Sequence, residues 1–89
     1  MNGMKIKLSD GREIEVISFG IASSGYMFIR VEMSMVDAIQ YFSTGTDVIT
    51  YEAGGESRRF IGFTNLAYVV NEETNVRVAL VRPAEFWEA

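Results

Sequence analysis

Carboxylates, lysine, tyrosine and serine are the residue types that could support catalysis here, because the sequence contains no histidine and no cysteine. Histidine is the commonest general base and metal ligand, and cysteine supplies thiolates for zinc sites and nucleophilic attack. An enzyme of this composition would depend on carboxylates, lysine, tyrosine or serine alone. No catalytic triad, metal ligand set or phosphate loop can be assembled from these residues. We therefore expect no catalytic site and no cofactor.

Carboxylates are the first candidates for acid–base chemistry, since a hydrolase can use one as the acid and another as the base. Such a pair works only when burial raises the pKa of one member. Most carboxylates of this chain alternate with apolar neighbours, so we expect them to face solvent. A carboxylate-based hydrolase is therefore the least favoured of our hypotheses. The carboxylates weighed for this role are Glu13, Glu15, Glu32, Asp37, Glu52, Glu72 and Glu73.

A glycine-rich stretch with two arginines, residues 54–59, has the composition of a loop that binds phosphate. Phosphate loops place backbone N–H groups at the N-terminus of a helix. Here Gly54 and Gly55 lead into an alternating strand pattern, and no Gly-Lys-Ser or Gly-Lys-Thr sequence follows. We interpret the stretch as a hairpin turn. The acidic residues also lack the regular spacing of a calcium loop, so we expect no metal site.

A single short helix over residues 34–42 is the element around which we expect the fold to be organised. Its apolar side chains, Met35, Ala38, Ile39 and Phe42, have the i, i+3, i+4, i+7 spacing of one helix face. Ser34 is suited to accept a hydrogen bond from a free backbone N–H group of the first turn. The apolar face needs a flat surface to cover it, which the flanking strands can supply.

Alternation of apolar and polar residues predicts strands over most of the remaining chain. Asp-Gly at positions 10 and 11 lies between two alternating segments, a strong hairpin signal because both residues tolerate positive φ. Lys5 and Lys7 would then face Glu13 and Glu15 on the solvent side. The predicted strands cover residues 4–8, 13–19, 26–33, 47–52, 58–64, 66–70 and 75–82.

The resulting element order, β-β-β-α-β-β-β-β, predicts the α+β class, with a strand-rich antiparallel sheet that is strongly twisted or barrel-like and packs on one short helix. At 89 residues we expect one domain over residues 1–89, with 83–89 as a C-terminal tail that begins at Pro83. The strand over 26–33 is the most apolar, so we place it in the interior of the sheet. Residues 6–11 resemble 49–54, but hairpins share this geometry and we infer no duplication.

The charge balance bears on partners and on location. The chain has 8 basic and 12 acidic residues, a formal net charge of −4, and no basic run. Nucleic-acid binding and binding to anionic membranes both depend on an excess of lysine and arginine, so we expect neither partner. No apolar segment approaches the roughly 20 residues of a spanning helix, and the N-terminus lacks the apolar part of a signal peptide. We expect a cytoplasmic protein.

Aromatic residues are the most informative candidates for an interface. Phe86 and Trp87 lie beyond Pro83, outside the last predicted strand. Tryptophan is enriched at binding hot spots, but the tail can equally fold back over the sheet of the same chain, and we leave both open. Tyr26 and Phe28 lie on the outer face of the strand over 26–33. These four residues are our candidate interface.

The opening hairpin over residues 4–16, the helix that ends at Phe42 and the segment 49–66 together cover most of the chain. In these segments the chain resembles small uncharacterised proteins encoded in prophages of gut Firmicutes. The resemblance implies a small component in or near a phage tail or baseplate module. It implies no catalytic residues, and it implies a location in the virion if a phage encodes the protein.

Taken together, the sequence favours a non-enzymatic structural or interaction protein that self-associates or docks on a larger protein. The alternative is a β-barrel module that binds a small molecule, although a chain this short has little interior volume to leave unfilled.

Overall fold

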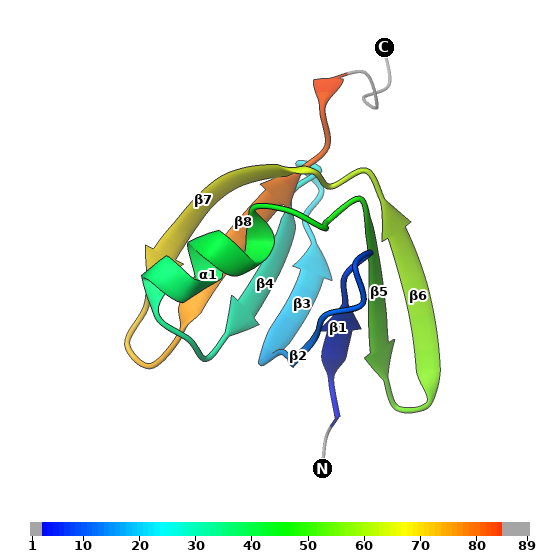
Figure 1. Ribbon diagram of the computed structural model, residues 1–89, viewed down its shortest axis with the longest axis horizontal. Helices are drawn as coiled ribbons and strands as arrows, with labels where there is room; N and C mark the ends of the chain where they lie inside the picture. Colours follow the sequence, from blue (N-terminus) through cyan, green and yellow to red (C-terminus); the bar gives the residue numbers. More distant parts are fainter. Residues whose placement is uncertain (1–2, 85–89) are drawn as a thin grey trace.

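The computed structural model describes residues 3–84 of the chain. These residues form eight strands and one helix, and the strands are divided between two four-stranded antiparallel sheets (Figure 1). This arrangement confirms the predicted α+β class. In chain order the elements are β1 (Lys5–Lys7), β2 (Glu13–Glu15), β3 (Ser18–Ile21), β4 (Met27–Val31), α1 (Met35–Phe42), β5 (Val48–Ala53), β6 (Glu56–Ile61), β7 (Asn65–Asn71) and β8 (Val76–Val81).

The first sheet has the strand order β2-β1-β5-β6. Its β1-β2 hairpin has the predicted register, which places Lys5 opposite Glu15 and Lys7 opposite Glu13. The Nζ atom of Lys5 lies 3.3 Å from a carboxylate oxygen of Glu13 and 3.8 Å from one of Glu52. These pairs are exposed, so each contributes at most about 1 kcal/mol and mainly favours the register.

The second sheet has the strand order β3-β4-β8-β7. As predicted, β4 lies in the interior of its sheet, where it pairs with β3 on one side and β8 on the other. Met27, Ile29 and Val31 of β4 are fully buried, and Phe28 and Arg30 face the other side of the sheet and are half-buried. Strand alternation therefore divides β4 into a core face and an outer face.

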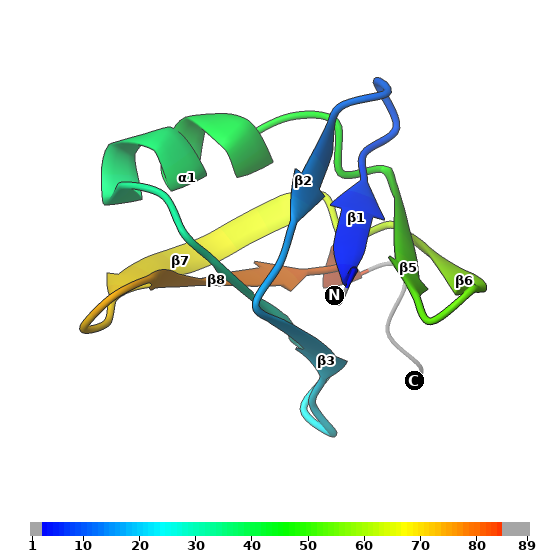
Figure 2. The same cartoon turned by 90° about the horizontal axis from the view of Figure 1, so that it is seen from below.

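The core lies between the second sheet on one side and the first sheet with α1 on the other. Figure 2 shows α1 and the β1-β2 hairpin on the same side of the β7-β8 ribbon. The 3-residue strands β1 and β2 leave little room for further apolar side chains, so most of the core comes from β4, β8 and the helix. The buried apolar residues are Ile6, Leu8, Val16, Met27, Ile29, Val31, Ala38, Phe42, Ile49, Phe63, Val76, Val78 and Leu80.

The helix forms where the sequence predicts it. The Ser34 hydroxyl accepts a hydrogen bond from the Asp37 backbone N–H at 3.0 Å, the expected cap. Ala38 and Phe42 are buried against the sheets, but Ile39 is 44% exposed, so the prediction that Ile39 belongs to the buried face is wrong. Successive helix residues are about 100° apart, and α1 contacts mainly β7, so the covered stripe is too narrow to include Ile39.

One predicted strand is two strands in the structure. Residues 13–19 divide into β2, which belongs to the first sheet, and β3, which belongs to the second. The Val16 N–H still donates to Met4, whereas the next N–H, of Ile17, donates to Arg30 of the other sheet. The chain therefore changes sheets at Val16, and the single sheet of the prediction is a pair of sheets.

Candidate functional site

Three aromatic rings form a cluster on the outer face of the second sheet. The ring centroids of Tyr26 and Phe28 are 5.9 Å apart, and the Tyr68 centroid lies 6.4 Å from that of Tyr26 and 6.5 Å from that of Phe28. These distances and tilted angles are typical of favourable aromatic contacts. We call Tyr26, Phe28 and Tyr68 the aromatic face. It unites two predicted interface residues with one that sequence reasoning did not single out.

A β-bulge brings Tyr68 to the aromatic face. Leu66 pairs with Leu80, but the next pair along the ladder is Tyr68 with Ala79, so Ala67 is an extra residue in β7. Without the extra residue, Tyr68 would pair with Val78 and face the core. The bulge therefore places Tyr68 next to Ala79, whose other neighbour is Phe28. Tyr68 is 39% exposed.

Two arginines flank the aromatic face, and both form ion pairs with the same carboxylate. Arg30 and Arg77 lie opposite each other in the β4-β8 ladder, which would be unfavourable without a counter-ion. Glu72 supplies it, with oxygens 3.0 Å from Nη2 of Arg30 and 3.6 Å from Nε of Arg77. The Arg77 guanidinium also lies 5.6 Å from the centre of the Phe28 ring. The ion-pair cluster therefore contains two positive charges and one negative charge.

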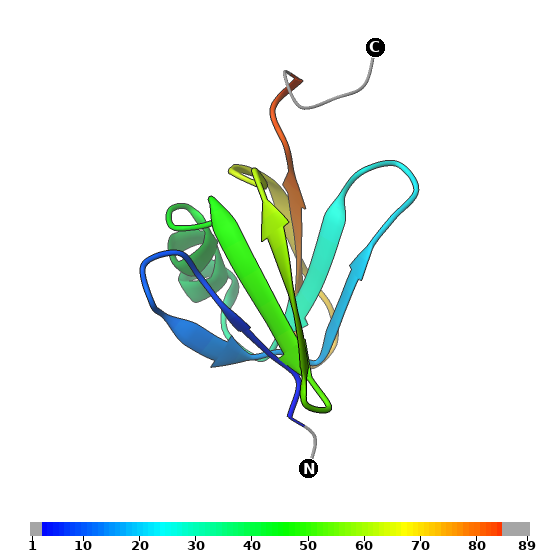
Figure 3. The same cartoon turned by 90° about the vertical axis from the view of Figure 1, so that its right-hand side faces the viewer.

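A groove of about 320 Å³ opens between β3 of the second sheet and the β5-β6 hairpin of the first. Its apolar surface comes from Phe19, which stacks on Tyr51 with centroids 4.4 Å apart and tilts against Phe60 at 5.3 Å. Ile21 and Arg58 complete the rim. In Figure 3, β3 and β6 diverge toward the end of the molecule where β8 leaves its sheet.

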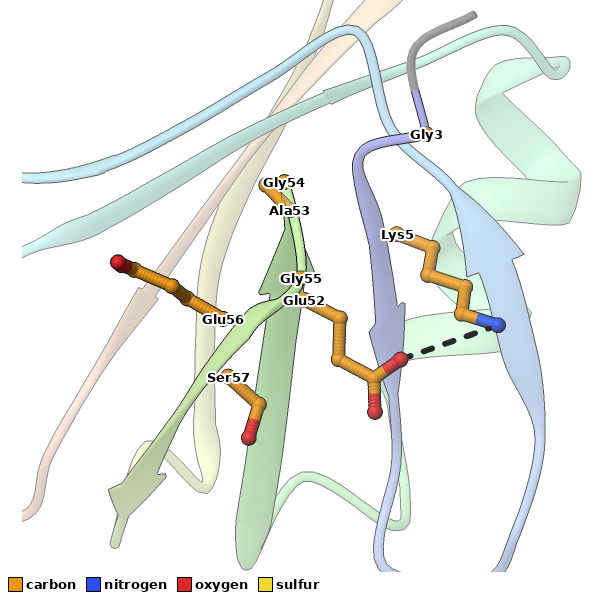
Figure 4. A pocket seen from close by; sticks show the side chains of 8 residues that line it. All are labelled: Gly3, Lys5, Glu52, Ala53, Gly54, Gly55, Glu56 and Ser57. Atoms are coloured by element: carbon orange, nitrogen blue, oxygen red, sulfur yellow. Dashed lines mark ion pairs between the residues drawn. The ribbon is translucent and has the colours of Figure 1, made fainter.

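A second hollow lies beside the turn between β5 and β6 (Figure 4). Gly54 and Gly55 both have positive φ and form the two-residue turn, which confirms the hairpin interpretation of this stretch. Lys5 reaches toward Glu52, and Glu56 points away from both. The hollow therefore presents a charged sheet surface, and the glycines lead into β6 and not into a helix.

Arg12 joins the β1-β2 turn to the C-terminal end of α1 through hydrogen bonds and a contact with an aromatic ring. The Nε of Arg12 donates to both carboxylate oxygens of Asp10, at 3.1 and 2.9 Å, and Nη2 donates to the Thr44 carbonyl at 2.9 Å. The guanidinium lies 4.6 Å from the centre of the Tyr41 ring. Hydrogen bonds from Arg12 lower the pKa of Asp10, and burial raises the pKa of Tyr41. This cluster positions the helix.

Carboxylates in the described part of the chain are mostly exposed or ion-paired. Within residues 3–84, no three histidine, cysteine, aspartate or glutamate side chains are grouped so that they could hold a metal ion. None of the helices in that range has the length and apolar character to cross a membrane. Phe86 and Trp87, the other two predicted interface residues, lie outside the described residues.

Comparisons with known proteins add no relative. A scan against family models finds no match to this chain, and searches of curated proteins and of solved structures find none either. The aromatic face and the groove are therefore the two surfaces of the described residues that bear on function.

Proposed function

We propose that the chain is a non-enzymatic assembly protein that binds a protein partner, or a second copy of itself, through the aromatic face. The observation that carries this proposal is the position of Tyr26, Phe28 and Tyr68 on the outside of the sheet. Aromatic rings that serve only to stabilise a core are expected inside it. These three rings instead pack on one another on the outer face of the sheet, opposite the core side chains of β4 and β8. Aromatic and arginine side chains are the types enriched at binding hot spots.

The charged side chains beside the aromatic face indicate what kind of group on the partner would bind there. Arg30 and Arg77 share the single carboxylate of Glu72, so the edge of the aromatic face favours an acidic group on the partner. An interface of this kind has an apolar centre and a charged rim. The resemblance to prophage proteins suggests a partner within a phage tail or baseplate.

Sedimentation and site-specific crosslinking together test the proposal. Sedimentation velocity over a range of concentrations should show self-association that Tyr68→Ser weakens. If the partner is another protein, a photoreactive phenylalanine analogue at position 68 should crosslink to it in host cells. Val36 supplies the control position because it is apolar and 63% exposed but lies on the outer side of α1.

The proposal fails if the protein is a monomer at all concentrations and position 68 crosslinks no more than position 36. Crosslinks at position 68 that persist unchanged in a Phe28→Ser background would also contradict it, because the neighbouring ring is part of the same surface.

Small-molecule binding is the second candidate, and the groove of Phe19, Tyr51 and Phe60 is the observation that favours it. Its rings would stack on an apolar ligand, and Arg58 would attract an anionic one. Calorimetric titration of the wild type and of Phe19→Ala with apolar and anionic ligands tests this candidate. A flat response to every ligand would contradict it.

A further inference from the structure

The free edge of β6 borders the groove, and the proposed assembly function does not use it. Within residues 3–84, β6 is the last strand of the first sheet, and β5 is the one element with which it has extensive contact (Figure 1). We propose that this edge binds an extended, acidic segment of a partner protein, which adds to the first sheet as a further antiparallel strand. Strand addition to an exposed sheet edge is a recurring mode of peptide recognition.

The backbone of β6 presents hydrogen-bonding groups at this edge. In an antiparallel pair, the N–H and C=O groups of alternate residues point toward the neighbouring strand, and those of the residues between them point away. The Gly62 N–H donates to the Asp47 carbonyl, so every second residue before Gly62 also points its groups toward β5. The backbone groups of Ser57, Arg59 and Ile61 therefore point outward, and all three residues are exposed.

The other sheet edges are less suited to strand addition. Strands β2 and β3 are 3 and 4 residues long, and β7 contains the bulge at Ala67. Short length and bulges both protect an edge against pairing. Strand β6 has 6 residues, no proline and an unbroken register with β5. Among the described strands it is therefore the edge that offers a partner the longest regular ladder.

Two arginines give this edge a preference for acidic segments. Arg58 and Arg59 are both exposed, and among the described residues neither forms an ion pair, a side-chain hydrogen bond or a ring contact. Glu56 lies at the turn end of β6, and Glu52, on the same face as Arg59, is paired with Lys5. Arg58 lines the groove and Arg59 faces the other way. Carboxylates at two successive positions of an added strand would therefore meet one arginine on each face.

The groove supplies a place for one aromatic side chain of the added strand. Phe60 is half-buried, lies on the same face as Arg58 and tilts against Phe19 with ring centroids 5.3 Å apart. A side chain opposite Phe60 would point to the same face and cover the exposed part of these rings. Because the added strand runs antiparallel to β6, the segment that fits has an aromatic residue followed by two acidic residues.

A second copy of β6 is disfavoured as the added strand. The antiparallel registers that join outward-pointing residues and overlap most of β6 place Arg58 opposite the same residue of the other copy, or Arg59 opposite its own counterpart. Like charges directly opposite each other destabilise a sheet. The two arginines therefore oppose pairing between copies and favour a partner strand that carries carboxylates.

Peptide binding to the full-length protein tests the proposal. The probe is the fluorescently labelled, C-terminally amidated peptide Ser-Val-Tyr-Glu-Glu-Thr-Ser, whose Tyr and two Glu would lie opposite Phe60, Arg59 and Arg58. We expect its fluorescence anisotropy to show saturable binding with a Kd below about 1 mM. The peptide with Lys in place of both Glu should bind at least about tenfold more weakly.

Methylation of the peptide backbone distinguishes strand addition from charge attraction alone. The N–H of the first Glu would point toward β6 and that of the second Glu would point away. N-methylation of the first Glu should therefore weaken binding about tenfold, and N-methylation of the second should weaken it less than about threefold. Equal effects of the two methyl groups would overturn strand addition.

Protein variants test the assignment to β6. Arg58→Gln with Arg59→Gln should remove the preference for the glutamate peptide over the lysine peptide. Lys5→Gln with Lys7→Gln is the matched control, because it removes the same charge from β1, an interior strand of the same sheet, and should preserve the preference. Loss of the preference in both variants would overturn the assignment. A glutamate peptide that does not bind at about 1 mM would overturn the proposal and leave the arginines only the role of protecting the edge.

Discussion

Phe19 and Tyr51 stack face to face across the two sheets, with ring centroids 4.4 Å apart and planes 8° from parallel. Phe19 belongs to β3, at the edge of the second sheet, and Tyr51 to β5, in the interior of the first. Strands β3 and β6 do not pair, so side chains and not backbone hydrogen bonds join the sheets on this side. The stack is therefore expected to be important for the stability of the whole domain.

Replacement of Phe19 by alanine should destabilise the protein by about 2 kcal/mol, less than a fully buried phenylalanine because the ring is half-buried. Urea unfolding followed by far-ultraviolet circular dichroism measures the change. Ile21→Ala is the control, since Ile21 is on the same strand and 44% exposed, and should cost about 0.5 kcal/mol. Equal losses for the two variants would contradict a structural role for the stack.

Gly45→Ala should destabilise the protein more than Gly25→Ala, although both glycines have positive φ, +79° and +97°. At Gly45 the new methyl group would also lie 2.8 Å from Oδ2 of Asp10, which Arg12 holds in place. At Gly25 it would meet no atom within 4 Å. We expect losses of about 3 and about 1 kcal/mol, measured as shifts of the urea midpoint. Equal losses would show that the Asp10 carboxylate moves freely.

The ion pair of Asp10 and Arg12 should make stability depend on pH in the acid range. Hydrogen bonds from Arg12 lower the pKa of Asp10 from its ordinary value of 3.8, so the folded state releases this proton more readily than the unfolded state. The resulting stabilisation is present above pH 3.8 and is lost as pH falls through the lower pKa of the folded state. Asp10→Asn should therefore be less stable than wild type at pH 6, and the difference should shrink toward pH 2.

Arg12→Gln is the matched variant for this prediction, because it removes the guanidinium and leaves both the carboxylate and the residue 12 backbone N–H that also donates to it. It should reduce the same acid-dependent part of the stability without abolishing it. A difference between wild type and Asp10→Asn that stays constant from pH 6 to pH 2 would contradict the assignment.

Tyr41 should make the protein sensitive to alkali. Burial raises the pKa of Tyr41 above its ordinary value of 10.0, so the unfolded state loses this proton first and stability falls as pH rises above 10. The Tyr41 hydroxyl has no hydrogen-bond partner among the described residues. Tyr41→Phe should therefore stay within about 0.5 kcal/mol of wild type at pH 7 and lose less stability at pH 11. Thermal unfolding at the two pH values measures both effects, and a large loss at pH 7 would reveal a hidden partner of the hydroxyl.

Local signals predicted the helix and the hairpins well. Ser34 caps α1 as expected, and the turns at Gly11 and at Gly54-Gly55 have the positive φ angles that their sequences favour. The prediction that Tyr26 and Phe28 lie together on the outside of β4 agrees with their ring contact. Each of these features depends on residues within a few positions of one another, which is why the sequence alone was sufficient.

Features that depend on residues far apart in the chain could not be predicted from the sequence in this way. The change of sheet at Val16 has no glycine or proline to mark it, and its one trace in the sequence is that the apolar residues shift from even positions to odd ones between Val16 and Ile17. Tyr68 reaches the aromatic face only because Ala67 is inserted in the β7-β8 ladder, a question of register that the sequence of β7 does not decide. The exposure of Ile39 likewise follows from how much of α1 the neighbouring strands cover.

Each sheet combines a hairpin from the N-terminal half of the chain with one from the C-terminal half. The halves meet where β1 pairs with β5 and where β4 pairs with β8. Neither half can complete a sheet alone, so two fragments cut between α1 and β5 should fold only when they are mixed. By the same reasoning, two full-length chains that opened at residues 43–47 could exchange their C-terminal halves. Each domain of the resulting domain-swapped dimer would have the native contacts, and no new interface would be required.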